Sequence, residues 1–158
     1  MEDSFVRNVN LAQSLVARFT PGQDLFGRLK EIMVERGLPR IVVLSGIGSL
    51  EEITMRDLKD GIQRPINLDK TNEIIRKGPF ELLSLEGSVV PMDGDPVVHL
   101  HGVLGMPDGS VIGGHLFEAR VFTTLELFIA AIEDTDLHKQ PSPVTGLNEY
   151  TVGRDAPQ

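Results

Sequence analysis

The sequence has no cysteine among its 158 residues. This absence excludes disulfide bonds, thiolate nucleophiles and the sulfur-rich class of zinc sites. Any metal must therefore be held by nitrogen and oxygen ligands. Long apolar runs are also lacking. Residues 1–10 carry charges where a signal peptide would be apolar, and no later stretch approaches the ~20 apolar residues of a membrane span. We therefore expect a soluble cytoplasmic protein.

Positive charge is in short supply. The chain has 15 basic and 23 acidic residues, which gives a formal net charge of −8. Such a surface repels phosphate backbones, so binding to nucleic acid would need a local basic patch or a partner. A mild basic cluster is diluted by neighbouring acidic residues, and we interpret it as a solvated loop. Its members are Arg56, Lys59, Arg64, Lys70, Arg76 and Lys77.

The length and a hydrophobic content of 41% predict one globular domain with a core of normal size. Apolar spacing indicates a helix that begins near Leu25 and ends near Gly37. We expect residues 1–138 to form the domain and the Pro- and Gly-rich residues 139–158 to form a tail that drapes over it or frays. Strand-like segments cover residues 14–20, 41–46, 51–58, 80–90, 97–106, 110–117 and 120–129.

Short turns join the last four of these segments, which favours an antiparallel meander. Residues 59–79 contain two prolines and two glycines and are predicted to form a long loop with at most a short helix. The fold class is therefore α/β in the α+β sense, with a mostly antiparallel sheet, one main helix and few others.

The turn at Pro107-Asp108-Gly109 sets the register of one hairpin. Proline presets φ for the first turn position and glycine accepts the left-handed conformation, so a three-residue loop is expected. Counting outward from this loop places His101 opposite His115. Because side chains alternate along a strand, His99 shares their face, while an apolar set faces the core. That set is Val98, Leu100, Leu104, Ile112 and Leu116.

Three of the four histidines thus lie on one face of the hairpin. Opposed strand residues have Cβ atoms roughly 4.5–5.5 Å apart, and imidazole nitrogens bind zinc at ~2.0–2.1 Å. The sequence therefore predicts a divalent metal site, most simply zinc, at His99, His101 and His115, with one coordination position left open. The alternative is that these histidines form hydrogen bonds across a subunit interface. Glu126 is a candidate outer ligand or general base, although a solvent-facing strand glutamate is the simpler and favoured interpretation.

Several segments resemble the plant-and-prokaryote-conserved (PPC) domain family. They are GQDLFGRLKEIMVERG, IVVLSGIGSLEEITMR, FELLSLEGSVV, HLHGVLGMPDGSVIGGHL and TTLELFI, in the family's order and between about Ser14 and Ala131. The resemblance implies a stand-alone α/β domain that forms a homotrimer and a metal, usually zinc, at the three histidines. A trimer would also cover the edges of a long meander.

The resemblance leaves function open. Plant members carry AT-hook motifs, and prokaryotic members are labelled predicted DNA-binding proteins by that association, yet this sequence has no R-G-R-P hook. One fold can serve unrelated activities. Three hypotheses remain: a regulatory or ligand-binding protein, a DNA-associated protein, and a metal-dependent enzyme acting on a small polar substrate.

Overall fold

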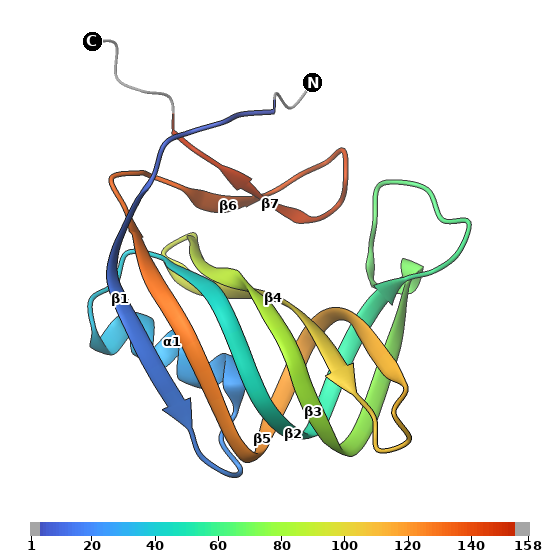
Figure 1. Ribbon diagram of the computed structural model, residues 1–158. Coiled ribbons are helices and arrows are strands. Elements are labelled where there is room, and N and C mark those ends of the chain that lie inside the picture. Colours follow the sequence, from blue (N-terminus) through green and yellow to red (C-terminus); the bar gives the residue numbers. More distant parts are fainter. Residues whose placement is uncertain (1–3, 154–158) are drawn as a thin grey trace.

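The computed structural model describes residues 4–153, and within them it is built almost entirely of strands (Figure 1). The elements in chain order are β1 (Asn10–Phe19), α1 (Leu25–Glu35), β2 (Ile41–Leu58), η1 (Leu68–Lys70), β3 (Thr71–Met92), β4 (Asp95–Gly105), β5 (Val111–Glu133), β6 (His138–Pro141) and β7 (Asn148–Thr151). No helix in this part of the chain is long and apolar enough to cross a membrane.

The main sheet closes on itself. Its strand order is β1-β5-β2-β3-β4, and the first part of β5 also pairs with β4. All these pairings are antiparallel. The expected fold class, a mostly antiparallel sheet with one main helix, is confirmed. The simple open meander is not, because β2, β3, β4 and β5 form a closed ring to which β1 is added.

Two pairs of expected strands are single strands. Residues 41–46 and 51–58 belong to β2, and residues 110–117 and 120–129 fall mainly within β5. β-bulges let both strands bend around the ring, with register shifts such as that between Val43 and Ser45. Gly48 lies between the two expected strand segments. It sits at φ 149°, where a Cβ atom would lie 2.2 Å from the carbonyl oxygen of Thr124.

The predicted loop over residues 59–79 is wrong in its second half. Residues 71–79 begin β3 and pair with the end of β2, with Leu58 opposite Thr71 and Glu52 opposite Lys77. Residues 71–79 are largely exposed, so their charged side chains hide the strand pattern in the sequence. The first half is a loop that Lys59 and Lys70 bind together, since their Nζ atoms donate to backbone carbonyls at 2.6–2.9 Å.

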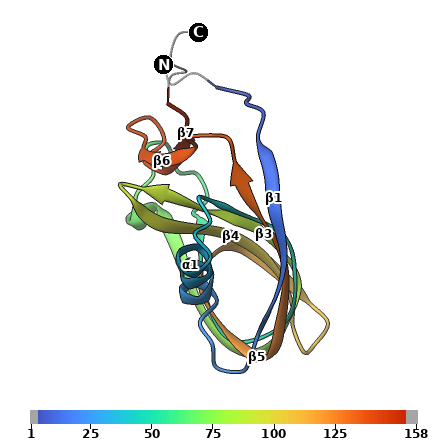
Figure 2. The same cartoon turned by 90° about the vertical axis from the view of Figure 1, so that its left-hand side faces the viewer.

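Helix α1 lies where the sequence predicts it. The Asp24 side chain accepts hydrogen bonds from the backbone N–H groups of Phe26 and Gly27, which satisfies two donors that a helix start leaves unpaired. Gly37, at φ 61°, follows the helix end. The helix packs against the sheet through three buried side chains, and Figure 2 shows it along one side of the sheet. These are Leu25, Leu29 and Met33.

The segment expected to be a tail forms a small sheet of its own. Strands β6 and β7 pair as an antiparallel hairpin that lies over one end of the barrel (Figure 1). Contacts join it to the barrel, including a 2.5 Å hydrogen bond between the hydroxyls of Tyr150 and Ser88. The remainder of the expected tail, residues 154–158, lies outside the described residues.

Candidate metal centre

The hairpin register predicted from the Pro107–Gly109 turn is confirmed. The N–H of Met106 donates to the carbonyl of Ser110 at 2.8 Å, and that of Gly109 donates to the carbonyl of Met106 at 2.9 Å. His101 consequently pairs with His115, and Gly102 with Gly114. The local turn chemistry therefore fixes which side chains of β4 and β5 share a face.

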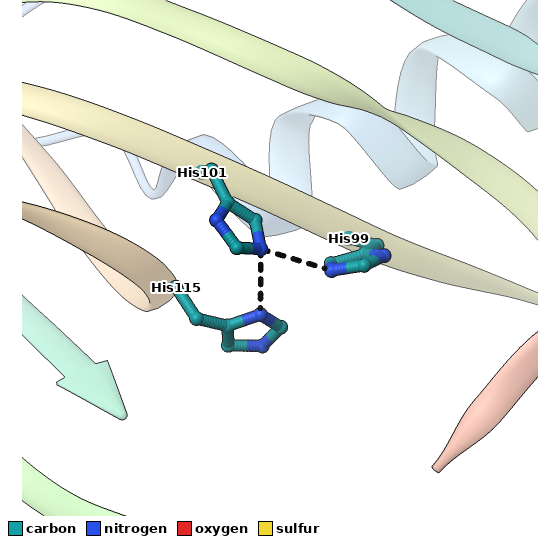
Figure 3. Close-up of side chains that lie close together, drawn as sticks. All are labelled: His99, His101 and His115. Atoms are coloured by element: carbon teal, nitrogen blue, oxygen red, sulfur yellow. Dashed lines mark hydrogen bonds between the residues drawn. The ribbon is translucent and has the colours of Figure 1, made fainter. Parts of the chain in front are cut away.

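Opposite faces of this hairpin have opposite surroundings. Leu100, Leu104 and Leu116 point into the core and are at most 1% exposed. Val98 and Ile112 pack against the same core and are partly buried. The three histidines point the other way and turn their rings toward one another (Figure 3). The predicted division of the hairpin into a core face and a histidine face is therefore correct.

The ring nitrogens meet at distances that suit a metal ion. His101 Nε2 lies 3.3 Å from His99 Nε2 and 3.3 Å from His115 Nδ1. Two nitrogens at ~2.0–2.1 Å from one tetrahedral ion are separated by about 3.3–3.4 Å, by simple trigonometry from the zinc–nitrogen distance. One nitrogen from each ring lies within 4.8 Å of the others. Two of the three nitrogen separations therefore match those around a tetrahedral ion, and the third is no longer than 4.8 Å.

The surroundings hold two of the imidazoles in the neutral form. Burial lowers the pKa of His99 to about 4, and the nearby charges of Lys139 and the other two histidines act in the same direction. Burial also lowers the pKa of His115, helped by His101 and Lys139 and opposed by Asp57. Neutral imidazole has the free lone pair that metal binding requires.

Asp57 of β2 fixes the backbone of β5 beside the histidines. Its carboxylate accepts a hydrogen bond of 3.1 Å from the N–H of His115. Glycine is needed next to it, because a Cβ atom on Gly114 would lie 2.0 Å from the Asp57 Oδ1 atom. The ring of Phe117 packs 5.2 Å from the ring of His115. These contacts orient His115 without occupying the nitrogen that faces His101.

Lys139 is the residue of this site that sequence reasoning missed. It belongs to β6, its Nζ atom lies 3.2 Å from Nδ1 of His99, and it sits 5.3 Å from the centre of the Tyr150 ring. It is only 4% exposed, and within residues 4–153 no carboxylate forms an ion pair with it. Burial lowers the pKa of this ammonium group. No local motif around residue 139 could have revealed a contact formed only by the fold.

A cavity of about 720 Å³ opens in front of the histidines. The barrel forms its floor, while the loop before β3 and the β6–β7 hairpin form its walls. These two walls are joined by a 2.6 Å hydrogen bond from the N–H of Ile66 to the carbonyl of Thr145. The lining includes the three histidines, Lys139, Tyr150, Arg56, Asp57, Glu149 and a largely apolar remainder.

Neither the candidate carboxylate Glu126 nor the fourth histidine lies at this site. Glu126 is exposed on β5, where it pairs with Ile47 of β2 and Arg18 of β1, and it does not line the cavity. His138 contacts the carbonyl of Asp136 and the Gln140 side chain instead of the other histidines. The structure thus gathers three of the four histidines and leaves the proposed carboxylate elsewhere.

The chain is thus a small closed antiparallel barrel whose three clustered histidines line a cavity. The sequence matches the family described as "Plants and Prokaryotes Conserved (PCC) domain" over residues 6–133, and the chain belongs to that family. This is the family that the sequence motifs resembled, so that identification is confirmed.

Solved structures share the whole fold. The metal-containing protein AF0104 from Archaeoglobus fulgidus superposes with a TM-score of 0.81 at 26% identity, covering 94% of this chain and 99% of its own. A plant- and prokaryote-conserved (PPC) protein from Pyrococcus horikoshii gives 0.78 at 26% identity, covering 94% and 100%.

A curated relative is much longer. "Bifunctional protein GlmU" from Synechococcus sp. (strain JA-3-3Ab) is 33% identical over 140 residues, which make up 88% of this chain and 20% of the relative. A second strain's protein of that name is 34% identical over 136 residues. The chain therefore spans about a fifth of the length of these relatives.

Proposed function

We propose that this PCC-domain protein binds a divalent metal, expected to be zinc, through His99, His101 and His115, and that it serves a regulatory or ligand-binding role as a homotrimer. The observation that carries the metal assignment is that Nε2 of His101 lies 3.3 Å from a ring nitrogen of each of the other two histidines. The description of the similar Archaeoglobus protein as metal-containing supports it. Nitrogen-only ligands and tetrahedral spacing favour zinc.

The three imidazoles are neutral ligands, so a bound divalent ion would keep its full charge. When bound, such an ion supplies Lewis acidity and an open coordination position. The protein's own part is to hold the rings at this spacing, to keep His99 and His115 unprotonated, and to wall the site with the cavity.

Metal analysis of the chain purified without a histidine tag tests this proposal. We expect up to one zinc per chain in the wild type and none in His101→Ala or His115→Ala. The matched control, His138→Ala, should keep the wild-type content because His138 lies outside the cluster. Zinc should be released on acidification, since protonated imidazole cannot ligate, and at a more acidic pH than an ordinary histidine would give.

Two outcomes would defeat the assignment. One is a wild-type chain that takes up neither zinc nor manganese nor nickel without a chelator present. The other is a His138→Ala chain that loses metal as completely as the His101 variant.

The trimer proposal rests on an exposed apolar surface. Val16, Phe128 and Ile47 are 54–72% exposed on three neighbouring strands. Together with one further exposed side chain on each of β2, β3 and β4, they make up what we call the outer apolar face. Large exposed apolar patches mark interfaces in soluble proteins. The members of the outer apolar face are Val16, Leu44, Ile47, Leu83, Val103 and Phe128.

The two alternatives have less support. A structural neighbour from Ralstonia eutropha is described as a "Putative DNA-binding protein", but at 19% identity it shares the fold only. The net charge of −8 opposes binding to DNA. A metal-dependent enzyme would need a base near the metal; Glu126, the base predicted from the sequence, does not reach the cavity, although Asp57 and Glu149 line it.

A further inference from the structure

A buried positive charge stands beside the histidine cluster without a counter-charge. Lys139 is 4% exposed, and its polar contact is with a ring nitrogen of His99. Burying a charge is costly unless an opposite charge or a set of hydrogen bonds compensates it. A divalent ion on the three histidines would add two further positive charges next to it. The site therefore calls for an anion.

The other charged groups of the cavity do not supply that anion. Arg56 is itself a cation, and Glu73, which pairs with it, does not line the cavity. Asp57 accepts a hydrogen bond from the backbone N–H of His115, and Glu149 lines the cavity, but within residues 4–153 neither carboxylate forms an ion pair with Lys139. A direct partner for the Lys139 ammonium group would therefore have to be an external anion.

The walls of the cavity decide what kind of anion fits. Away from Lys139 and the histidines the lining is mainly aliphatic and aromatic, so it would leave a fully hydrated ion such as phosphate short of hydrogen-bond donors. A volume of about 720 Å³ is that of a pocket for a small organic molecule. The apolar lining residues include Leu58, Ile66, Leu68, Val97, Val98, Phe117 and Leu147.

We propose that this cavity binds a small organic carboxylate, with the carboxylate between Lys139 and the open position of the histidine-bound metal and the apolar body against Leu58, Ile66 and Leu68. The inference rests on the proposed metal site and deepens it by naming the ligand class. Lys139 is a ligand-binding residue in this arrangement, since its ammonium group neutralises the carboxylate.

Hexanoate, hexanamide and acetate are suitable probes, measured by calorimetry and by the visible absorption of the full-length chain loaded with cobalt(II). We expect hexanoate to bind and to change the cobalt spectrum. Hexanamide, which lacks the charge, and acetate, which lacks the apolar body, should each bind at least tenfold more weakly. Equal binding of hexanoate and hexanamide, or phosphate binding as tightly as hexanoate, would overturn the proposal.

Variants separate the two ends of the ligand. Lys139→Met should weaken hexanoate at least tenfold when compared with the wild type at equal cobalt loading, whereas Lys30→Met, on the exposed side of α1, should leave hexanoate binding at the wild-type value. Should Lys139→Met fail to fold, Lys139→Arg must retain binding, and Leu68→Asn must weaken hexanoate while sparing acetate, because Leu68 lines the cavity and is 64% exposed.

Failure of the ligand proposal can be told apart from failure of the metal proposal. A chain that holds metal but does not prefer hexanoate to hexanamide refutes only the carboxylate site. In a chain that takes up no metal, Lys139 alone should still favour hexanoate, and Lys139→Met should abolish that preference. A metal-free chain without this preference would refute the carboxylate site as well.

Discussion

The neutral state of His99 is imposed by its environment. The ring is half-buried, faces the Lys139 ammonium and has two other imidazoles beside it. Each of these influences opposes protonation, so the same arrangement that frees a lone pair for metal also makes the fold sensitive to acid.

This sensitivity has a defined direction. Folding moves the pKa of His99 from 6.5 to about 4, so between these values the unfolded chain binds a proton that the folded chain rejects. Stability must then fall as the pH drops through this window. We expect wild-type protein, stripped of metal by a chelator, to lose about 1 kcal/mol more than His99→Gln between pH 7 and pH 5. The figure is below the full value of the shift because water screens a half-buried ring.

Urea unfolding at the two pH values measures this difference. His115 still contributes in the variant, since its pKa is also lowered, so the variant should retain a smaller dependence on pH. If the two proteins lost the same free energy of unfolding between pH 7 and pH 5, folding would not shift the pKa of His99.

At the level of strands, one glycine of β3 sets the position of β4 behind His99. Gly87 has φ 150°, and a Cβ atom there would lie 2.0 Å from the carbonyl oxygen of His99. We expect Gly87→Ala to lower the free energy of unfolding by about 1–3 kcal/mol and to weaken zinc binding, because β4 must move away. Urea denaturation and zinc titration provide the two measurements.

A second glycine provides the control variant for the effect of backbone conformation without a steric clash. Gly61 has φ 67° in an exposed turn with no atom within 4 Å of the added Cβ position. Gly61→Ala carries the cost of a left-handed residue but should leave zinc affinity at the wild-type value. If both variants bound zinc equally well, the close approach of β3 to β4 would not govern the site.

Elements formed by local chemistry could be predicted from the sequence, and those formed by distant contacts could not. The histidine face follows from a three-residue turn, and α1 follows from its capping residue and its apolar spacing. The sequence predicts two strands each for β2 and β5 because bulges interrupt the alternation of apolar and polar residues along them. It does not predict the strand at residues 71–79, because that strand is exposed and lacks an apolar face. Lys139 reaches His99 from 40 residues away, and no pattern near either residue encodes that contact.

For the whole molecule, the outer apolar face predicts self-association. The argument from open sheet edges now applies only to the outer edge of β1, because β4 and β5 pair and close the ring. We expect light scattering at micromolar concentration to give three times the chain mass. Phe128→Asp should shift the protein toward monomer, since it places a charge at the centre of an apolar contact.

The control lies away from the sheet. Val34 is 70% exposed on α1, so Val34→Asp changes an exposed apolar residue outside the outer apolar face and should leave the mass unchanged. A wild-type monomer, or equal dissociation of both variants, would refute the trimer.

The charge of the molecule predicts weak binding to DNA. With −8 on each chain, we expect the protein alone to bind duplex DNA more weakly than micromolar near physiological salt. Fluorescence anisotropy at several salt concentrations measures this. Micromolar or tighter binding that disappears when Arg76 and Lys77 of β3 are neutralised would instead favour the DNA-associated function.

The family match ends at residue 133, yet one wall of the cavity comes from residues 138–150. The barrel and the histidine cluster therefore belong to the shared part of the family, whereas Lys139 and Tyr150 come from the segment that follows it. Substitutions in that segment would change one wall of the cavity while leaving the barrel core in place, and only a change at Lys139 would also remove a contact with His99. If the cavity binds a ligand as proposed, relatives with superimposable barrels need not share that ligand.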